Sequence, residues 1–85
     1  MSGTVTLKLF ALLGAKLPKG SLANSTSVEL DKDASVAGVI ADYGLNDKDC
    51  HLVLLNGNFI AAETRAATTV TEGDVISIWP PIGGG

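Results

Sequence analysis

Apolar and polar residues alternate in three short segments of the chain, which is the pattern of half-buried β-strands. These segments are residues 4–10, 27–31 and 75–79. In the first segment, one face carries the aliphatic side chains Val5, Leu7 and Leu9. The opposite face carries Thr6, Lys8 and Phe10. We expect the first two segments to pair as an antiparallel hairpin, joined by a long polar connection at residues 14–25.

One segment has the period of a helix instead. Apolar residues recur there at positions i, i+3, i+4 and i+7, and these are Val36, Val39, Ile40 and Tyr43. Ser35 is a suitable N-cap, and Gly44 suits the left-handed conformation that often ends a helix. The pattern therefore predicts a helix over residues 36–44.

The second half of the chain predicts two further strands. Residues 51–55 form an almost entirely apolar run, which indicates a buried strand. Asn56 and Gly57 both tolerate a positive φ, and together they are the strongest hairpin signal in the sequence. A short strand at 58–60 is expected to pair back, and residues 61–70 are expected to be irregular.

These elements predict an α+β fold in which the helix covers one face of the sheet. The other face should meet water. If Ile76 and Ile78 point toward the helix, Trp79 points away from it, and Phe10 does the same by the parity of its own strand. Aromatic side chains on an exposed face are typical of a partner surface. The alternative is that each aromatic side chain packs against the long connection.

Composition excludes several classes of function. The chain has 85 residues, which suffices for one domain spanning 1–85. Its formal net charge is −3 and its six basic residues are scattered, so no surface for nucleic acid is indicated. A single cysteine excludes an internal disulfide. No apolar run approaches the length of a membrane span, so we expect no membrane partner and a cytoplasmic location.

No catalytic or metal-binding constellation is visible. Cys50 and His51 are neighbours in an apolar run, so their side chains should point to opposite faces of a strand and form no dyad. One histidine and one cysteine without further ligand spacing do not predict a metal site. We therefore expect no bound cofactor and a chain that is not an enzyme by itself.

The end of the sequence carries the most specific signal. The predicted strand at 75–79 runs directly into Pro80 and Pro81, which cannot donate backbone hydrogen bonds to a sheet. Ile82 and three glycines follow, and residues without a Cβ fit a narrow passage. We expect a thin, flexible tail over 80–85 whose terminal carboxylate is the reactive group. The alternative is a terminal extension without a function.

Three stretches of the sequence carry a family resemblance. They are Leu9-Phe10-Ala11, Leu54-Leu55-Asn56-Gly57, and the run from Glu72-Gly73-Asp74 to Trp79-Pro80-Pro81-Ile82-Gly83-Gly84-Gly85. In these, the chain resembles the ubiquitin-like sulfur carriers of the MoaD/ThiS family, which include the small subunit of molybdopterin synthase. The resemblance implies a β-grasp fold, with a mixed sheet of four to five strands and one main helix packed on one face.

The resemblance also implies partners and a chemistry. An E1-like adenylating enzyme would use ATP to activate the Gly85 carboxylate, and a donor of the desulfurase or rhodanese type would supply sulfur to form a thiocarboxylate. An acceptor synthase large subunit would then receive that sulfur. The residues implied to thread into partner sites are Pro80, Pro81, Ile82, Gly83 and Gly84. The residues implied to dock on partners are Phe10, Phe59 and Trp79.

The chain departs from the family pattern in two places. The family usually ends in two glycines after a different residue, whereas this chain ends in three, and residues 14–25 replace a segment that is often helical. The double proline favours the molybdopterin type over the thiazole type without deciding the product. Two other functions stay open: a ubiquitin-like modifier joined to lysines through Gly85, and a non-covalent interaction domain.

Overall fold

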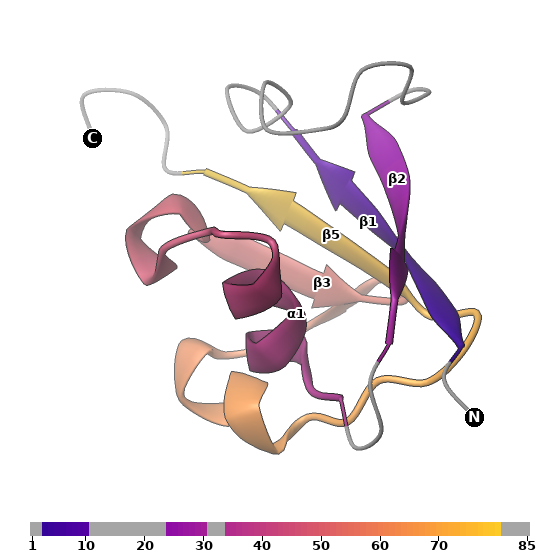
Figure 1. The fold of residues 1–85 in the computed structure, drawn as a ribbon. Helices are drawn as coiled ribbons and strands as arrows, with labels where there is room; N and C mark the ends of the chain where they lie inside the picture. The colour runs from indigo at the N-terminus through magenta and orange to yellow at the C-terminus, as the bar shows by residue number, and fades with distance from the viewer. Residues whose placement is uncertain (1–2, 11–23, 31–33, 81–85) are drawn as a thin grey trace.

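A mixed sheet forms the centre of the computed structural model, which describes residues 3–10, 24–30 and 34–80 (Figure 1). Within these residues the sheet has five strands in the order β2-β1-β5-β3-β4. The strands are β1 (Thr4–Leu9), β2 (Ser25–Glu29), β3 (Leu52–Leu55), β4 (Asn58–Phe59) and β5 (Val75–Trp79). The α+β class expected from the alternation and the helical period is confirmed.

The first and last strands of the chain lie side by side at the centre of the sheet. β1 and β5 are parallel, with Leu7 opposite Ile76 and Leu9 opposite Ile78. These four side chains have an exposed fraction of 0%, so they all face the same buried side. The hairpin partner β2 and the strand β3 pair antiparallel on either side of this central pair.

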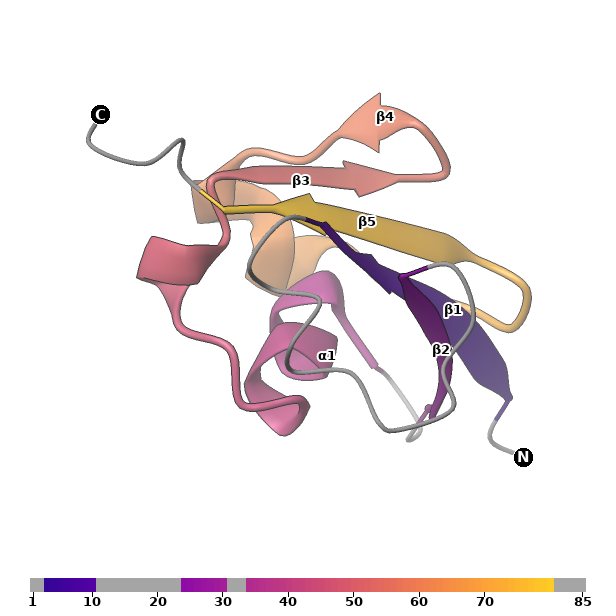
Figure 2. The ribbon, with the colours of Figure 1, turned by 90° about the horizontal axis from the view of Figure 1, so that it is seen from above.

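Helix α1 (Val36–Asp42) covers one face of the sheet (Figures 1 and 2). It begins as predicted, because the Ser35 hydroxyl accepts a hydrogen bond from the backbone N–H of Gly38 at 3.0 Å. It ends just before Gly44, which has a φ of 81°. Val36, Val39 and Ile40 are buried, and Tyr43 packs against the core while remaining partly exposed.

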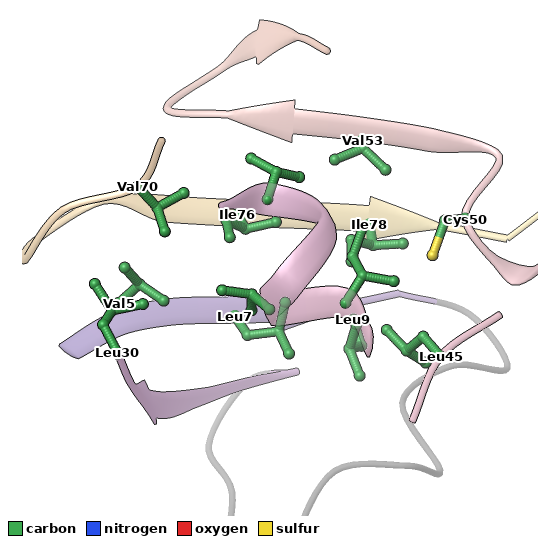
Figure 3. Close-up of a cluster of buried hydrophobic side chains, with 13 residues drawn as sticks. Val5, Leu7, Leu9, Leu30, Leu45, Cys50, Val53, Val70, Ile76 and Ile78 are labelled. Atoms are coloured by element: carbon green, nitrogen blue, oxygen red, sulfur yellow. The ribbon is translucent and has the colours of Figure 1, made fainter. Parts of the chain in front are cut away.

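The core lies between α1 and the sheet (Figure 3). Figure 3 shows the inward side chains of β1, β3 and β5 gathered under the helix, with Leu30, Leu45 and Val70 closing the sides. The 3₁₀ helices η2 (Asp47–Asp49) and η3 (Ala62–Ala67) lie on the same side of the sheet as α1 (Figure 2). The described elements therefore form two layers, and the opposite face of the sheet carries no described helix.

Two expectations from the sequence are wrong in detail. β2 begins two residues before the predicted strand at 27–31, because the ladder with β1 continues through Thr26 and Ser25, whose polar side chains carry no apolar alternation. Residues 61–70 are not irregular, because they contain η3. Backbone hydrogen bonds from Val36 to Thr68 and from Val70 to Ala34 hold this segment against the start of α1. Such long-range bonds leave no local pattern in the sequence.

The predicted Asn-Gly turn is confirmed, and its asparagine also ties the hairpin to β5. Asn56 and Gly57 have φ values of 52° and 87°. The Asn56 Nδ2 donates to Asp74 Oδ1 at 3.0 Å, and the backbone N–H of Val75 donates to Asn56 Oδ1 at 2.8 Å. The other Asp74 oxygen accepts from the backbone N–H of Thr71 at 2.9 Å. The hydrogen bonds from Thr71 and Asn56 lower the pKa of the Asp74 carboxyl.

Asp74→Asn should destabilise the fold at neutral pH, because one of the two acceptor oxygens becomes a donor facing another donor. The folded-state pKa of Asp74 lies below its unfolded value, so its ionised form stabilises the fold above about pH 4, and this contribution is lost as the pH falls below that value. Urea unfolding of the wild type and the variant at several pH values measures the difference. It should shrink as the pH falls, whereas the exposed control variant Glu72→Gln should change the free energy of unfolding at neutral pH by less than about 0.5 kcal/mol.

Candidate functional site

The aromatic residues predicted to dock on partners lie on the open face of the sheet, which is the face opposite α1. Leu52 lies directly opposite Trp79 in the β3–β5 ladder, and Leu54 lies opposite Phe59 in the β3–β4 ladder. Directly paired residues of an antiparallel ladder project to the same side of a sheet. Because Val53 between the two leucines is fully buried, Leu52, Leu54 and their partners face away from the helix.

Phe10 and Trp79 form a stacked pair at the end of β1 and β5. Their ring centroids are 4.3 Å apart and their planes are inclined by 4°. The backbone N–H of Phe10 donates to the carbonyl of Ile78 at 3.1 Å, which continues the central parallel pairing past the end of β1. Both side chains are partly exposed. Each ring therefore packs on the other. Strand parity predicts that Phe10 and Trp79 lie on one face of the sheet, but it does not predict that their rings are in contact.

Phe59 is the most exposed part of this face. Its side chain is 62% exposed, and among the described residues it is the large hydrophobic residue that stands out on the surface. It lies on β4, a two-residue strand at the edge of the sheet. An aromatic side chain presented to solvent in this way buries most of its area only when a partner covers it.

We call the apolar residues of this face the open-face cluster, which consists of Phe10, Leu52, Leu54, Phe59 and Trp79. The apolar run 51–55 predicts a buried strand, and this prediction is wrong for Leu52 and Leu54, which are partly exposed because they face away from the helix. The signal that could have found them was the pairing register with Trp79. Beside the cluster, Lys8 on β1 lies opposite Ser77 of β5, so the face turns polar toward β2.

The tail begins where this face ends. Pro80 follows Trp79 directly, is partly buried, and lies at the same end of β5 as the stacked pair. The predicted tail residues Pro81, Ile82, Gly83, Gly84 and Gly85 lie outside the described residues, and so does most of the connection at 14–25.

The neighbours Cys50 and His51 lie just before β3 and not within the predicted strand at 51–55, and their side chains differ in burial. Cys50 is buried with an exposed fraction of 3%, whereas His51 is exposed. Within residues 3–10, 24–30 and 34–80, no group of three or more histidine, cysteine, aspartate or glutamate side chains is placed to hold a metal ion. In the same residues, no helix has the length and apolar character needed to cross a membrane.

The region from the end of β1 to the final glycine carries a family signature. A family model described as the ThiS family matches residues 9–85. The chain belongs to the ThiS family. The match includes the open-face cluster and the glycine tail, and it confirms the resemblance drawn from the sequence. A search of curated protein sequences gives no match for this ThiS-family chain.

Solved structures with the same fold include archaeal and bacterial proteins. The HVO 2177 protein of Haloferax volcanii has 26% identity and a TM-score of 0.75, over 99% of this chain and 88% of that one. The small archaeal modifier protein SAMP1 of the same organism has 27% identity and a TM-score of 0.67, over 98% and 100% of the two chains.

A third similar structure is a complex of subunits 1 and 2 of the molybdopterin-converting factor from Helicobacter pylori 26695. The matched chain has 23% identity and a TM-score of 0.53, over 96% of this chain and 99% of that one. These likenesses confirm the ubiquitin-like β-grasp fold for this member of the ThiS family, with five strands among the described residues.

The stacked pair should contribute to stability beyond the area that each ring buries. A double-mutant cycle with Phe10→Ala and Trp79→Ala, followed by urea unfolding, should give a coupling free energy of about 0.5–1.5 kcal/mol. Phe59→Ala is the control, and it should change the free energy of unfolding by less than about 0.5 kcal/mol because that side chain is largely exposed. Strictly additive effects of the two substitutions would show that the rings do not interact in solution.

Proposed function

We propose that this chain is a sulfur carrier whose Gly85 carboxylate is adenylated by an ATP-dependent activating enzyme and then converted to a thiocarboxylate. The observation that carries the proposal is the junction at the end of β5. There the central strand, the stacked aromatic pair and Pro80 come together, and a glycine tail included in the ThiS-family match follows. This arrangement suits a chain that presents its own terminus as the reacting group.

The chemistry explains why such a chain needs no catalytic side chains. A carboxylate is a poor electrophile, and joining it to AMP makes a mixed anhydride with a good leaving group. ATP and the catalytic groups would be supplied by an E1-like adenylating enzyme, and a donor of the desulfurase or rhodanese type would supply the sulfur that displaces AMP. The protein is then a cosubstrate, or the small subunit of a sulfur-transfer enzyme, and holds no cofactor of its own.

The open-face cluster is the proposed docking surface for these partners. It places aromatic and leucine side chains at the centre and polar residues such as Lys8 and Ser77 at one side, which is the usual anatomy of a protein interface. Three of its residues, Phe10, Leu52 and Trp79, lie at the end of the sheet from which Pro80 leads away. A partner seated on the cluster would therefore be close to the start of the tail. The subunit complex from Helicobacter pylori supports a large-subunit acceptor as one of these partners.

The proposed product is molybdopterin or a related molybdenum or tungsten cofactor. The Pro80-Pro81 pair favours this type over the carrier of thiazole biosynthesis, which stays the next candidate. Because adenylation consumes ATP, we place the reaction in the cytoplasm.

A second function is favoured by one specific observation. SAMP1, which has 27% identity to this chain, is described as a small archaeal modifier protein. Under this alternative, the activated Gly85 carboxylate is joined to lysine side chains of other proteins. The same adenylation step and the same docking surface serve both functions, so the two differ in the nucleophile that receives the activated terminus.

The intact mass of the protein purified from its own host tests the carrier function. A mass increase equal to replacing one oxygen by sulfur, located on Gly85, is the expected result, and Cys50→Ser should leave it unchanged because the sulfur resides on the terminus. Deletion of Gly83, Gly84 and Gly85 together should abolish the modification, because no terminal glycine carboxylate remains. Gly85 found linked to lysines of other proteins, without the sulfur form, would favour the modifier function instead.

Phe59→Ala should weaken binding to the activating enzyme with little loss of fold stability. An aromatic anchor at the centre of an interface contributes about 2 kcal/mol or more, which corresponds to roughly thirtyfold in the dissociation constant. Glu63→Ala, an exposed position on η3 at the helix side, is the matched control. Isothermal titration calorimetry measures both. Equal affinities of the two variants for the activating enzyme would contradict the proposal that the open-face cluster is the docking surface.

A further inference from the structure

Arg65 on η3 is a buried cation that none of the functions above requires. Its exposed fraction is 5%, and it is the buried charged residue of the described chain. Its Nη2 donates a hydrogen bond to the backbone carbonyl of Cys50 at 2.9 Å. Its Nε is buried without a hydrogen-bond partner, and no carboxylate among the described residues forms an ion pair with it.

Stability alone gives a weak reason for this arrangement. Removing a guanidinium from water costs several kcal/mol unless partners compensate, and buried charges are often replaced by apolar side chains of similar size without loss of stability. A methionine at this position would fill a similar volume and would remove the unpaired buried Nε, at the loss of the hydrogen bond to the Cys50 carbonyl. The hydrogen bond to Cys50 therefore has another consequence, which is the position of the peptide that it holds.

The peptide group that accepts this hydrogen bond also donates one to the end of β5. The Cys50 carbonyl and the His51 N–H belong to the same peptide group, and this N–H donates to the carbonyl of Trp79 at 3.0 Å. A cation bound to the oxygen of a peptide polarises it and makes its N–H a stronger donor. The charge of Arg65 is thus connected, through the peptide between residues 50 and 51, to the carbonyl of the Trp79–Pro80 bond.

Within residues 3–10, 24–30 and 34–80, the Trp79 carbonyl accepts the last hydrogen bond of the sheet before the tail. Pro80 has no N–H and cannot extend the ladder. On the β1 side, the final hydrogen bond runs from Phe10 to Ile78, one residue earlier. Among the described residues, the hydrogen bond from His51 therefore fixes the orientation of the peptide from which residues 80–85 lead away.

We infer that Arg65 is a positioning residue for the reaction at Gly85, because its buried guanidinium fixes, through the Cys50–His51 peptide, the Trp79 carbonyl at which the tail leaves the sheet. This inference rests on the proposed function. The six residues from Pro80 to Gly85 span at most about 20 Å, so the position of the Trp79 carbonyl on a docked carrier sets the point from which Gly85 must reach the active site of the partner. The open-face cluster does not include Arg65, so docking and positioning are separable.

The test compares Arg65→Met and Arg65→Lys with the wild type in steady-state adenylation by the activating enzyme. Arg65→Met should fold with near wild-type stability and keep KM for the carrier within about twofold, while kcat falls about tenfold or more through misplacement of the carboxylate. Arg65→Lys keeps the charge and a donor, and should recover part of kcat. Amide hydrogen exchange at His51, followed by NMR, should be faster in Arg65→Met than in the wild type.

A second pair of variants tests the same connection without touching the buried charge. His51→Pro removes the N–H that donates to Trp79 and should lower kcat as Arg65→Met does. His51→Ala keeps that N–H, changes an exposed side chain, and should leave kcat unchanged. If Arg65→Met does not fold, the comparison of kcat between His51→Pro and His51→Ala tests the inference.

Two results would overturn the inference and leave the carrier function intact. They are an unchanged kcat in Arg65→Met together with unchanged exchange at His51, or an unchanged kcat in folded His51→Pro. Absence of any adenylation of the wild type would instead contradict the proposed function. In that case, exchange at the His51 amide in Arg65→Met still decides whether Arg65 holds the Trp79 carbonyl: faster exchange supports it, and equal exchange overturns it.

Discussion

The parallel pairing of β1 with β5 is the constraint on which the rest of this structure depends. It places the first and last strands of the described chain side by side at the centre of the sheet and aligns Leu7 with Ile76 and Leu9 with Ile78, all fully buried under α1. Since successive side chains of a strand point to opposite faces, burying these residues obliges Phe10 and Trp79 to face the other way. The stacked pair and the open-face cluster are thus a geometric consequence of how the core is filled.

The same pairing determines where Pro80, the first residue of the proposed reactive tail, leaves the sheet. β5 is held from both sides, by β1 through its parallel ladder and by β3 through its antiparallel ladder. A strand in that position is the most constrained place from which a chain can emerge. The terminal segment therefore starts from a fixed point beside an apolar surface, which suits a protein whose chemistry takes place at its own end and within the active sites of its partners.

Polar contacts at the margins of the sheet complete this arrangement. At the start of β5, Asn56 and Asp74 join the hairpin turn to the strand, and at its end the peptide between Cys50 and His51 joins it to the buried charge of Arg65. Both connections link residues that lie 15 or more positions apart in the sequence. Local unfolding at either end of β5 is opposed by a side chain from a different element.

The sequence by itself determined the elements whose signals are local. Alternation identified β1 and β5, the spacing of apolar residues and the Ser35 cap identified α1, and Asn56-Gly57 identified the hairpin, because each of these depends on residues only a few positions apart. Parity also placed Phe10 and Trp79 on one face. The proline and glycine signature, with the family resemblance that it carried, pointed to the terminus as the reacting group.

Only the tertiary structure decided the contacts between distant segments. The stacking of Phe10 on Trp79, the exposure of Leu52 and Leu54 beside them, and the burial of Arg65 in a segment expected to be irregular all follow from strand register and from how η3 packs. The local sequence around Arg65 is small and polar, and resembles a surface loop. Its burial depends on a carbonyl supplied by residue 50, and no pattern along the chain specifies a hydrogen bond to a backbone atom of another element.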